Sequence, residues 1–103
     1  MKKLVRNRIP EILQREGLDF STRNLAGDEL GRALIAKLKE EVAEMEEIFD
    51  IPTGLVQEIA DVYEVLVAII RHKGLSEHSI LRVMQDKCEE RGDFSEGIFV
   101  EMR

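Results

Sequence analysis

The sequence predicts an all-α protein, an antiparallel helical bundle, and three observations support this fold class. Apolar residues recur every three or four positions through two long stretches of the 103-residue chain, as along one face of a helix. The composition is 44% hydrophobic and 35% charged, with no Trp and two Pro, a balance typical of helices with solvated outer faces. The links between the predicted helices are short, which favours antiparallel neighbours. At this length we expect one domain over residues 1–103.

The first half of the chain is predicted to hold a short helix and a long one. Pro10 fits an early helical turn, and residues 11–16 continue that helix. The stretch 17–27 is rich in turn-forming residues and is predicted to be a connection that wraps the domain. Asp28 is a suitable N-cap for a second helix that ends near Phe49.

Two further helices are predicted in the second half. Thr53 is expected to cap the third helix, which runs to about Lys73 and stops at Gly74. Ser76 is expected to cap a fourth helix that ends near Gly92. The tail, 93–103, contains the apolar run 98–100, for which we expect a short strand or a docked extended segment.

The third predicted helix is apolar on most of its sides. Its apolar residues fall on two faces, one that includes Leu55, Val62 and Leu66 and one that includes Val56 and Tyr63. Such a helix has to be covered on most sides, and one chain of this length has few other helices to do so. We therefore expect oligomerisation, as a homodimer or homotetramer, to complete the bundle.

Charge and hydropathy exclude several classes of function. A net charge of −6 disfavours general DNA or RNA binding. No uncharged stretch approaches the roughly 20 residues that a membrane span needs, and no signal peptide is visible because the first apolar run stops at Val5. Cys88 is the sole cysteine, so no internal disulfide can form. We expect a cytoplasmic protein with neither a nucleic-acid nor a membrane partner.

Four carboxylates stand in two helical pairs, Glu41-x-x-Glu44 and Glu58-x-x-Asp61. At about 100° per residue, the first member of each pair falls inside the apolar stripe of its helix and the second at the edge of that stripe. Antiparallel packing would bring all four into one cleft. Burying carboxylates is costly unless a positive partner joins them, and magnesium prefers such oxygen ligands. The pattern indicates a magnesium site, with manganese as an alternative.

The basic residues that could accompany these pairs also have purely structural interpretations. Lys37 precedes Glu41 by four residues and can neutralise it by a salt bridge. Lys87 and Arg91 share one face of the fourth helix, where they can clamp a phosphate or stabilise the helix C-terminus. The opening segment carries another basic cluster, able to meet phosphates or to solvate a flexible end, made of Lys3, Arg6 and Arg8.

Three segments together resemble a known family. The run Lys37-Leu-Lys-Glu-Glu-Val-Ala-Glu44, followed by Glu58-Ile-Ala-Asp61, resembles the MazG-like all-α nucleotide pyrophosphohydrolases, whose pattern is ExxE, a spacer and ExxD. The opening run 3–11 and the run 87–94 resemble the small phosphoribosyl-ATP-pyrophosphohydrolase-like branch of that superfamily. The resemblance covers nearly the whole chain.

The resemblance implies a function and a set of site residues. A bundle of the MazG type would form by pairing of chains and would bind Mg²⁺ through Glu41, Glu44, Glu58 and Asp61. Glu40 would lie beside these ligands as a support or water activator, so the expected catalytic residues are Glu40 and Glu41. The residues expected to bind substrate phosphates are Lys37, Lys87 and Arg91.

The implied reaction splits a nucleoside triphosphate between its α and β phosphates, giving a monophosphate and pyrophosphate. Non-standard nucleotides are candidate substrates. Two alternatives stay open: a phosphoribosyl-ATP pyrophosphohydrolase, and a non-catalytic helical dimer that binds a nucleotide.

Overall fold

The α-helix is the one kind of regular secondary structure in the part of the chain that is described. A computed structural model describes residues 2–103, and these contain four α-helices and no strand. The helices are α1 (Ile9–Arg15), α2 (Gly27–Glu47), α3 (Pro52–His72) and α4 (Glu77–Arg91). The all-α prediction is therefore confirmed, and each of the four predicted helices is present within a few residues of its expected bounds.

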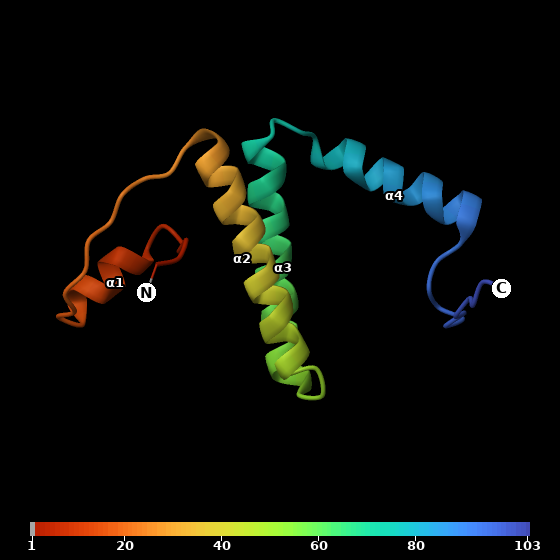
Figure 1. Cartoon of the computed structure of the whole chain (residues 1–103), viewed down its shortest axis with the longest axis horizontal. Coiled ribbons are helices and arrows are strands. Elements are labelled where there is room, and N and C mark those ends of the chain that lie inside the picture. Colours follow the sequence, from red (N-terminus) through yellow and green to blue (C-terminus); the bar gives the residue numbers. More distant parts are fainter. Residues whose placement is uncertain (1) are drawn as a thin grey trace.

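The centre of the molecule is a hairpin of the two long helices. α2 and α3 run antiparallel and pack along their lengths (Figure 1). Small residues allow close approach near both ends of the pair. A Cβ atom on Gly31 would lie 3.3 Å from Nε2 of His72, and one on Gly54 would lie 3.1 Å from Cδ1 of Ile48. The helix axes can therefore come close enough to bury the side chains that lie between them.

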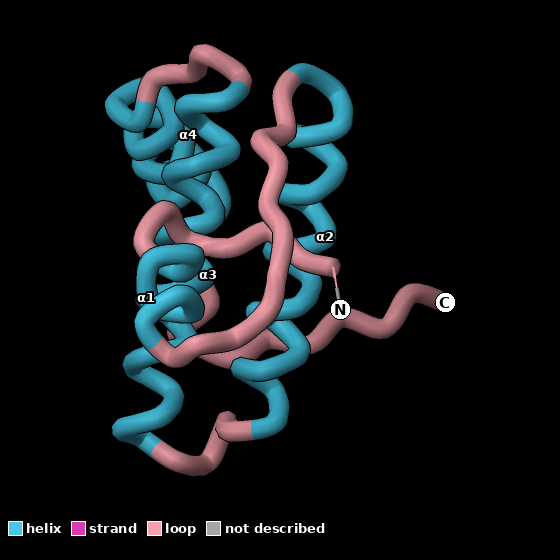
Figure 2. The backbone as a smooth tube through the Cα atoms, turned by 90° about the vertical axis from the view of Figure 1, so that its left-hand side faces the viewer, coloured by secondary structure: helices cyan, strands magenta, loops and turns pink. Residues whose placement is uncertain are grey.

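The two shorter helices lie on opposite sides of this hairpin (Figure 1). α1 is joined to α2 by a long loop, which stands apart from the hairpin and reaches it at the start of α2 (Figure 1 and Figure 2). α4 leads away from the end of α3 and does not pack extensively on α2 or α3. The Cα radius of gyration is 17.7 Å, against about 13 Å expected for a compact domain of this length. One chain thus forms a hairpin with two outlying helices rather than a closed bundle.

The core of this single chain is thin. Among the described residues, Leu34 and Val65 are the apolar side chains that count as buried. The accessible surface is 9570 Å², about 1.6 times the surface expected for a compact monomer of this mass. Large apolar side chains are exposed in stripes along the hairpin, formed by Ile35 and Val42 on α2 with Phe49 just beyond its end, and on α3 by Val56, Ile59, Tyr63 and Leu66.

Two of the predicted helix caps are wrong. Ala26 precedes α2, and Asp28 lies within the first turn, where its charge still favours the helix dipole. α3 begins at Pro52, preceded by Ile51 in an extended conformation. Proline suits the first helical position, and its ring favours an extended residue before it, so the helix starts one residue before Thr53.

The third predicted cap is confirmed, whereas the prediction for the tail is wrong. The hydroxyl of Ser76 accepts a hydrogen bond of 3.2 Å from the backbone N–H of Ser79. Beyond Gly92 the chain forms no strand and docks on no helix, since Phe94 and Phe99 are 99% and 88% exposed. In the described residues, no helix combines the length and the apolar character needed to span a membrane.

Ser76→Ala should unfold the start of α4. We expect a loss of about 1 kcal/mol of helix stability, because one helix N–H loses its partner. Since α4 packs little on the hairpin, faster amide exchange should stay confined to α4 in a hydrogen-exchange experiment. Ser79→Ala, which keeps the cap, is the control. Equal protection of α4 in both variants would contradict the role of the cap.

Candidate metal centre

The register of the hairpin places the carboxylates of α2 opposite those of α3. The close contacts near its two ends set Glu41 across from Asp61 and Glu44 across from Glu58. Because the helices are antiparallel, the first member of each pair faces the last member of the other. Two motifs of the same three-residue spacing therefore meet along one side of the seam, the line of contact between α2 and α3.

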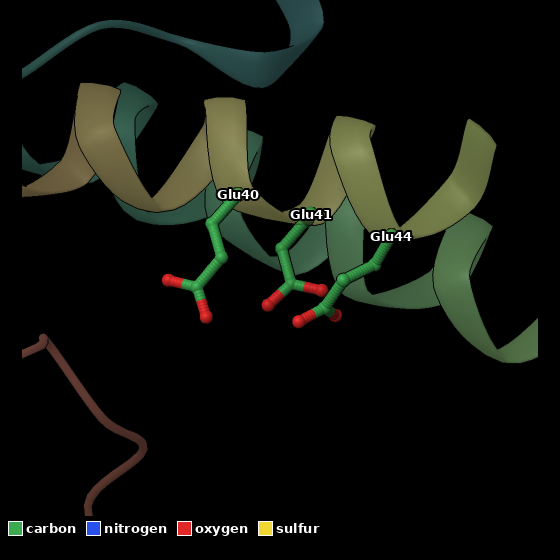
Figure 3. A group of neighbouring side chains, drawn as sticks. All are labelled: Glu40, Glu41 and Glu44. Carbon is green, nitrogen blue, oxygen red and sulfur yellow. The ribbon is translucent and has the colours of Figure 1, made fainter. Parts of the chain in front are cut away.

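The carboxylate oxygens form two overlapping groups. Glu40, Glu41 and Glu44 each offer an oxygen within 4.8 Å of the others, and Figure 3 shows their side chains projecting to one side of α2. Glu41, Glu58 and Asp61 form a second group within the same distance. Glu41 belongs to both groups and is thus the centre of the cluster.

Burial leaves part of this cluster without hydrogen bonds. Glu41 is 6% exposed and is the one polar residue that counts as buried in the described chain. Its Oε2 atom and the Oε2 atom of Glu58 are both inaccessible and have no hydrogen-bond partner. An unpaired buried carboxylate oxygen loses its hydration without compensation, at a cost of about 1–3 kcal/mol or more. These two oxygens are donor atoms of the kind that bind a divalent cation.

Lys37 neutralises part of the charge, as its spacing predicts. Its Nζ lies 3.4 Å from Oε1 of Glu41 and 3.5 Å from Oε1 of Glu40. Both contacts use an Oε1 atom, so the salt bridge leaves the buried Oε2 of Glu41 unpaired. One lysine does not balance five acidic side chains, and a strong negative field remains.

That field shifts the protonation of two carboxylates. Burial raises the pKa of Glu58 to about 7, helped by a hydrogen bond that its protonated carboxyl donates to Glu41 and by the negative charges of Glu44, Glu41 and Asp61. Burial and the neighbouring Glu41 likewise raise the pKa of Glu44. The metal-free cluster therefore holds a proton on Glu58 up to a pKa of about 7, and a bound cation would displace this proton.

The remaining predicted site residues lie elsewhere. Lys87 and Arg91 are exposed on α4, and because α4 leads away from the hairpin they are not brought to the carboxylates of the same chain. The basic residue that does reach the cluster from a distant segment is Arg6, whose guanidinium lies 2.8 Å from Asp61. No spacing rule relates two residues 55 positions apart, so only the basic character of the opening segment pointed to Arg6.

The comparisons with known proteins add one partial match. A protein of Mycolicibacterium smegmatis is 51% identical over 45 residues, which make up 44% of this chain and 46% of that protein. The matched part thus spans about half the length of this relative, whose name is that of an uncharacterized protein. No protein-family model and no solved structure matches the chain.

The stability of the metal-free protein should fall as the pH rises from about 4.5 to about 7. The folded state holds a proton on Glu58 up to a pKa of about 7, whereas the unfolded chain releases it near 4.5. Folding therefore binds a proton in this window, so the stabilisation is complete below it and lost above it. Urea unfolding at a series of pH values, with a chelator present, measures the slope.

Glu58→Gln should flatten that slope, because the amide carries no charge at any pH. Glu46→Gln, an exposed change on α2, should leave the slope as in the wild type. Identical pH profiles for the wild type and Glu58→Gln would contradict the assignment of a raised pKa to Glu58.

Proposed function

We propose that this protein is a magnesium-dependent nucleotide pyrophosphohydrolase that cleaves the α–β phosphoanhydride of a nucleoside triphosphate. The observation that carries the proposal is the pair of buried, unpartnered Oε2 atoms on Glu41 and Glu58, which lie on opposite helices of one seam. The resemblance of the ExxE and ExxD pairs to the MazG-like family agrees with this site and supplies the reaction. A cytoplasmic location fits a chain with one free thiol, Cys88.

The donor set fits a hard divalent cation. Glu41, Glu44, Glu58 and Asp61 would hold magnesium through carboxylate oxygens, the ligands that Mg²⁺ and Mn²⁺ favour. No His or Cys belongs to either carboxylate group, which disfavours a zinc site. Magnesium bound there supplies positive charge to phosphate oxygens and makes water a better nucleophile near neutral pH.

The side chains around this set have separate tasks. Glu40 is half-buried next to Glu41 and takes the proton of the attacking water. The water oxygen forms a new bond to phosphorus, the bridging P–O bond of the anhydride breaks, and pyrophosphate leaves with the bonding electrons. Lys37, held between Glu40 and Glu41, places a positive charge beside the reacting phosphates.

The active form in this proposal is a homodimer or homotetramer. The exposed stripes on α2 and α3 supply apolar area, and two specific partners typically bury about 800 Å² each. The large accessible surface and the thin core of one chain both favour a second copy as the covering partner. Pairing of this kind would bring Lys87 and Arg91 of one chain close to the carboxylates of another, and would complete the MazG-type bundle.

Glu41→Gln and Glu58→Gln should each lower magnesium-dependent pyrophosphate release by at least about 100-fold while leaving the helical content unchanged. Each change removes a charged metal ligand but keeps the shape of the side chain. The assay is pyrophosphate release from a panel of ordinary and modified nucleoside triphosphates, with and without magnesium. Glu46→Gln and Glu47→Gln, exposed changes on α2, are the matched controls.

The panel also separates the alternatives. Full activity in both Glu41→Gln and Glu58→Gln would contradict the assignment of these residues as metal ligands. Release from phosphoribosyl-ATP alone would identify the narrower pyrophosphohydrolase. Magnesium-dependent nucleotide binding without release from any substrate would favour the non-catalytic helical dimer.

Light scattering should give a mass at least twice the 11.8 kDa of one chain. Tyr63→Lys places a charge in the exposed stripe of α3, where Tyr63 is 66% exposed, and should shift the protein toward smaller species. Gln57→Lys adds the same charge to α3 about 100° or more away from that stripe and should leave the mass unchanged. A monomeric wild type at micromolar concentration would rule out the oligomer.

A further inference from the structure

Arg6 connects the opening segment to the edge of the carboxylate cluster. Its Nη2 atom lies 2.8 Å from Oδ1 of Asp61, and its Nη1 atom lies 3.4 Å from Oε1 of Glu64. All the ion pairs that join segments distant in sequence, within residues 2–103, involve this guanidinium. Asp61 and Glu64 stand three positions apart on α3, so Arg6 spans neighbouring turns of the helix.

These contacts leave the guanidinium free to bind something else. Arg6 meets each carboxylate through a single nitrogen, which occupies two of its five N–H donors. Its side chain is 57% exposed, so solvent or a ligand can reach the other donors. Exposed pairs of this kind contribute little to stability, about 0–1 kcal/mol, so folding alone gives a weak reason for the pair.

The position of Arg6 suits a phosphate bound at the cluster. A triphosphate held by magnesium at Glu41, Glu58 and Asp61 would bring several anionic oxygens next to Asp61. Arginine forms short, paired hydrogen bonds with such oxygens through its planar fork. Lys37, which is held between Glu40 and Glu41, has a side chain that is 19% exposed and is therefore less open to a ligand than Arg6. The basic residues of α4 lie away from this chain's hairpin. Within residues 2–103, Arg6 is thus the more exposed of the two cations that contact this cluster.

We propose that Arg6 binds a phosphate group of the substrate while Asp61 and Glu64 hold its guanidinium at the edge of the site. This inference rests on the proposed function, because it needs a metal-held triphosphate at the carboxylates. It adds Arg6 alone to the phosphate-binding residues, from a part of the chain far in sequence from the ExxE and ExxD pairs. In Figure 3, the reddish-brown trace at the lower left belongs to the start of the chain. It lies on the side of the hairpin toward which Glu40, Glu41 and Glu44 project.

Calorimetry with inorganic tripolyphosphate tests the role of Arg6 without depending on the base of the nucleotide. In saturating magnesium, Arg6→Ala should weaken tripolyphosphate binding by roughly 10- to 100-fold, the effect of losing a charge-assisted hydrogen bond. Arg6→Lys, which keeps the charge but loses the fork, should fall between Arg6→Ala and the wild type. The affinity for magnesium alone should change by less than about threefold in both variants, since Arg6 is not a ligand.

Arg8→Ala is the matched control, because it removes the same charge two residues away and Arg8 takes part in none of the ion pairs found in residues 2–103. Wild-type affinity in Arg6→Ala would overturn the inference, and so would equal losses in Arg6→Ala and Arg8→Ala. A parallel loss of magnesium affinity would make Arg6 a support for Asp61 and would also overturn it. A wild type that binds no magnesium would overturn the proposed function and this inference together.

Discussion

The burial of carboxylates in the seam between α2 and α3 is the constraint on which the rest of the structure depends. Glu41 is as well buried as the core residue Leu34, each 6% exposed, in a hairpin that buries very little else. A seam that served stability alone would place an apolar side chain there, because the free energy lost by desolvating a carboxylate exceeds the stabilisation from one salt bridge with a lysine. In our proposal, a cation bound in the seam supplies the partner that the buried oxygens of Glu41 and Glu58 lack.

The same constraint connects local structure to the chemistry that we propose. Close contacts at Gly31 and Gly54 set the register, and the register sets Glu41 against Asp61 and Glu44 against Glu58. A shift of either helix by one residue would rotate its carboxylates by about 100° and separate the two pairs. The small residues of the seam thus position the candidate ligands even though they touch no substrate.

Local patterns in the sequence predict the four helices and the inward direction of Glu41, because helical periodicity depends on residues only three or four positions apart. The capping rule succeeds at Ser76 and fails at Thr53, where Pro52 takes the first helical position. The outlying position of α4 and the contact between Arg6 and Asp61 could not be predicted, because they depend on long-range packing. The metal, the reaction and the oligomer stay predictions from the residue pattern and the family resemblance.

Crystallographic location of manganese tests the central claim most directly, because Mn²⁺ takes the same oxygen ligands as Mg²⁺ and can be found by its anomalous scattering. Crystals grown with Mn²⁺ well above pH 7, where Glu58 is largely ionised, should show a peak at the seam in contact with Glu41 and Glu58. The carboxylates of Glu44 and Asp61 should complete its ligands. A seam without any peak, in which a proton or a basic side chain of a second copy satisfies the Oε2 atoms of Glu41 and Glu58, would contradict the account.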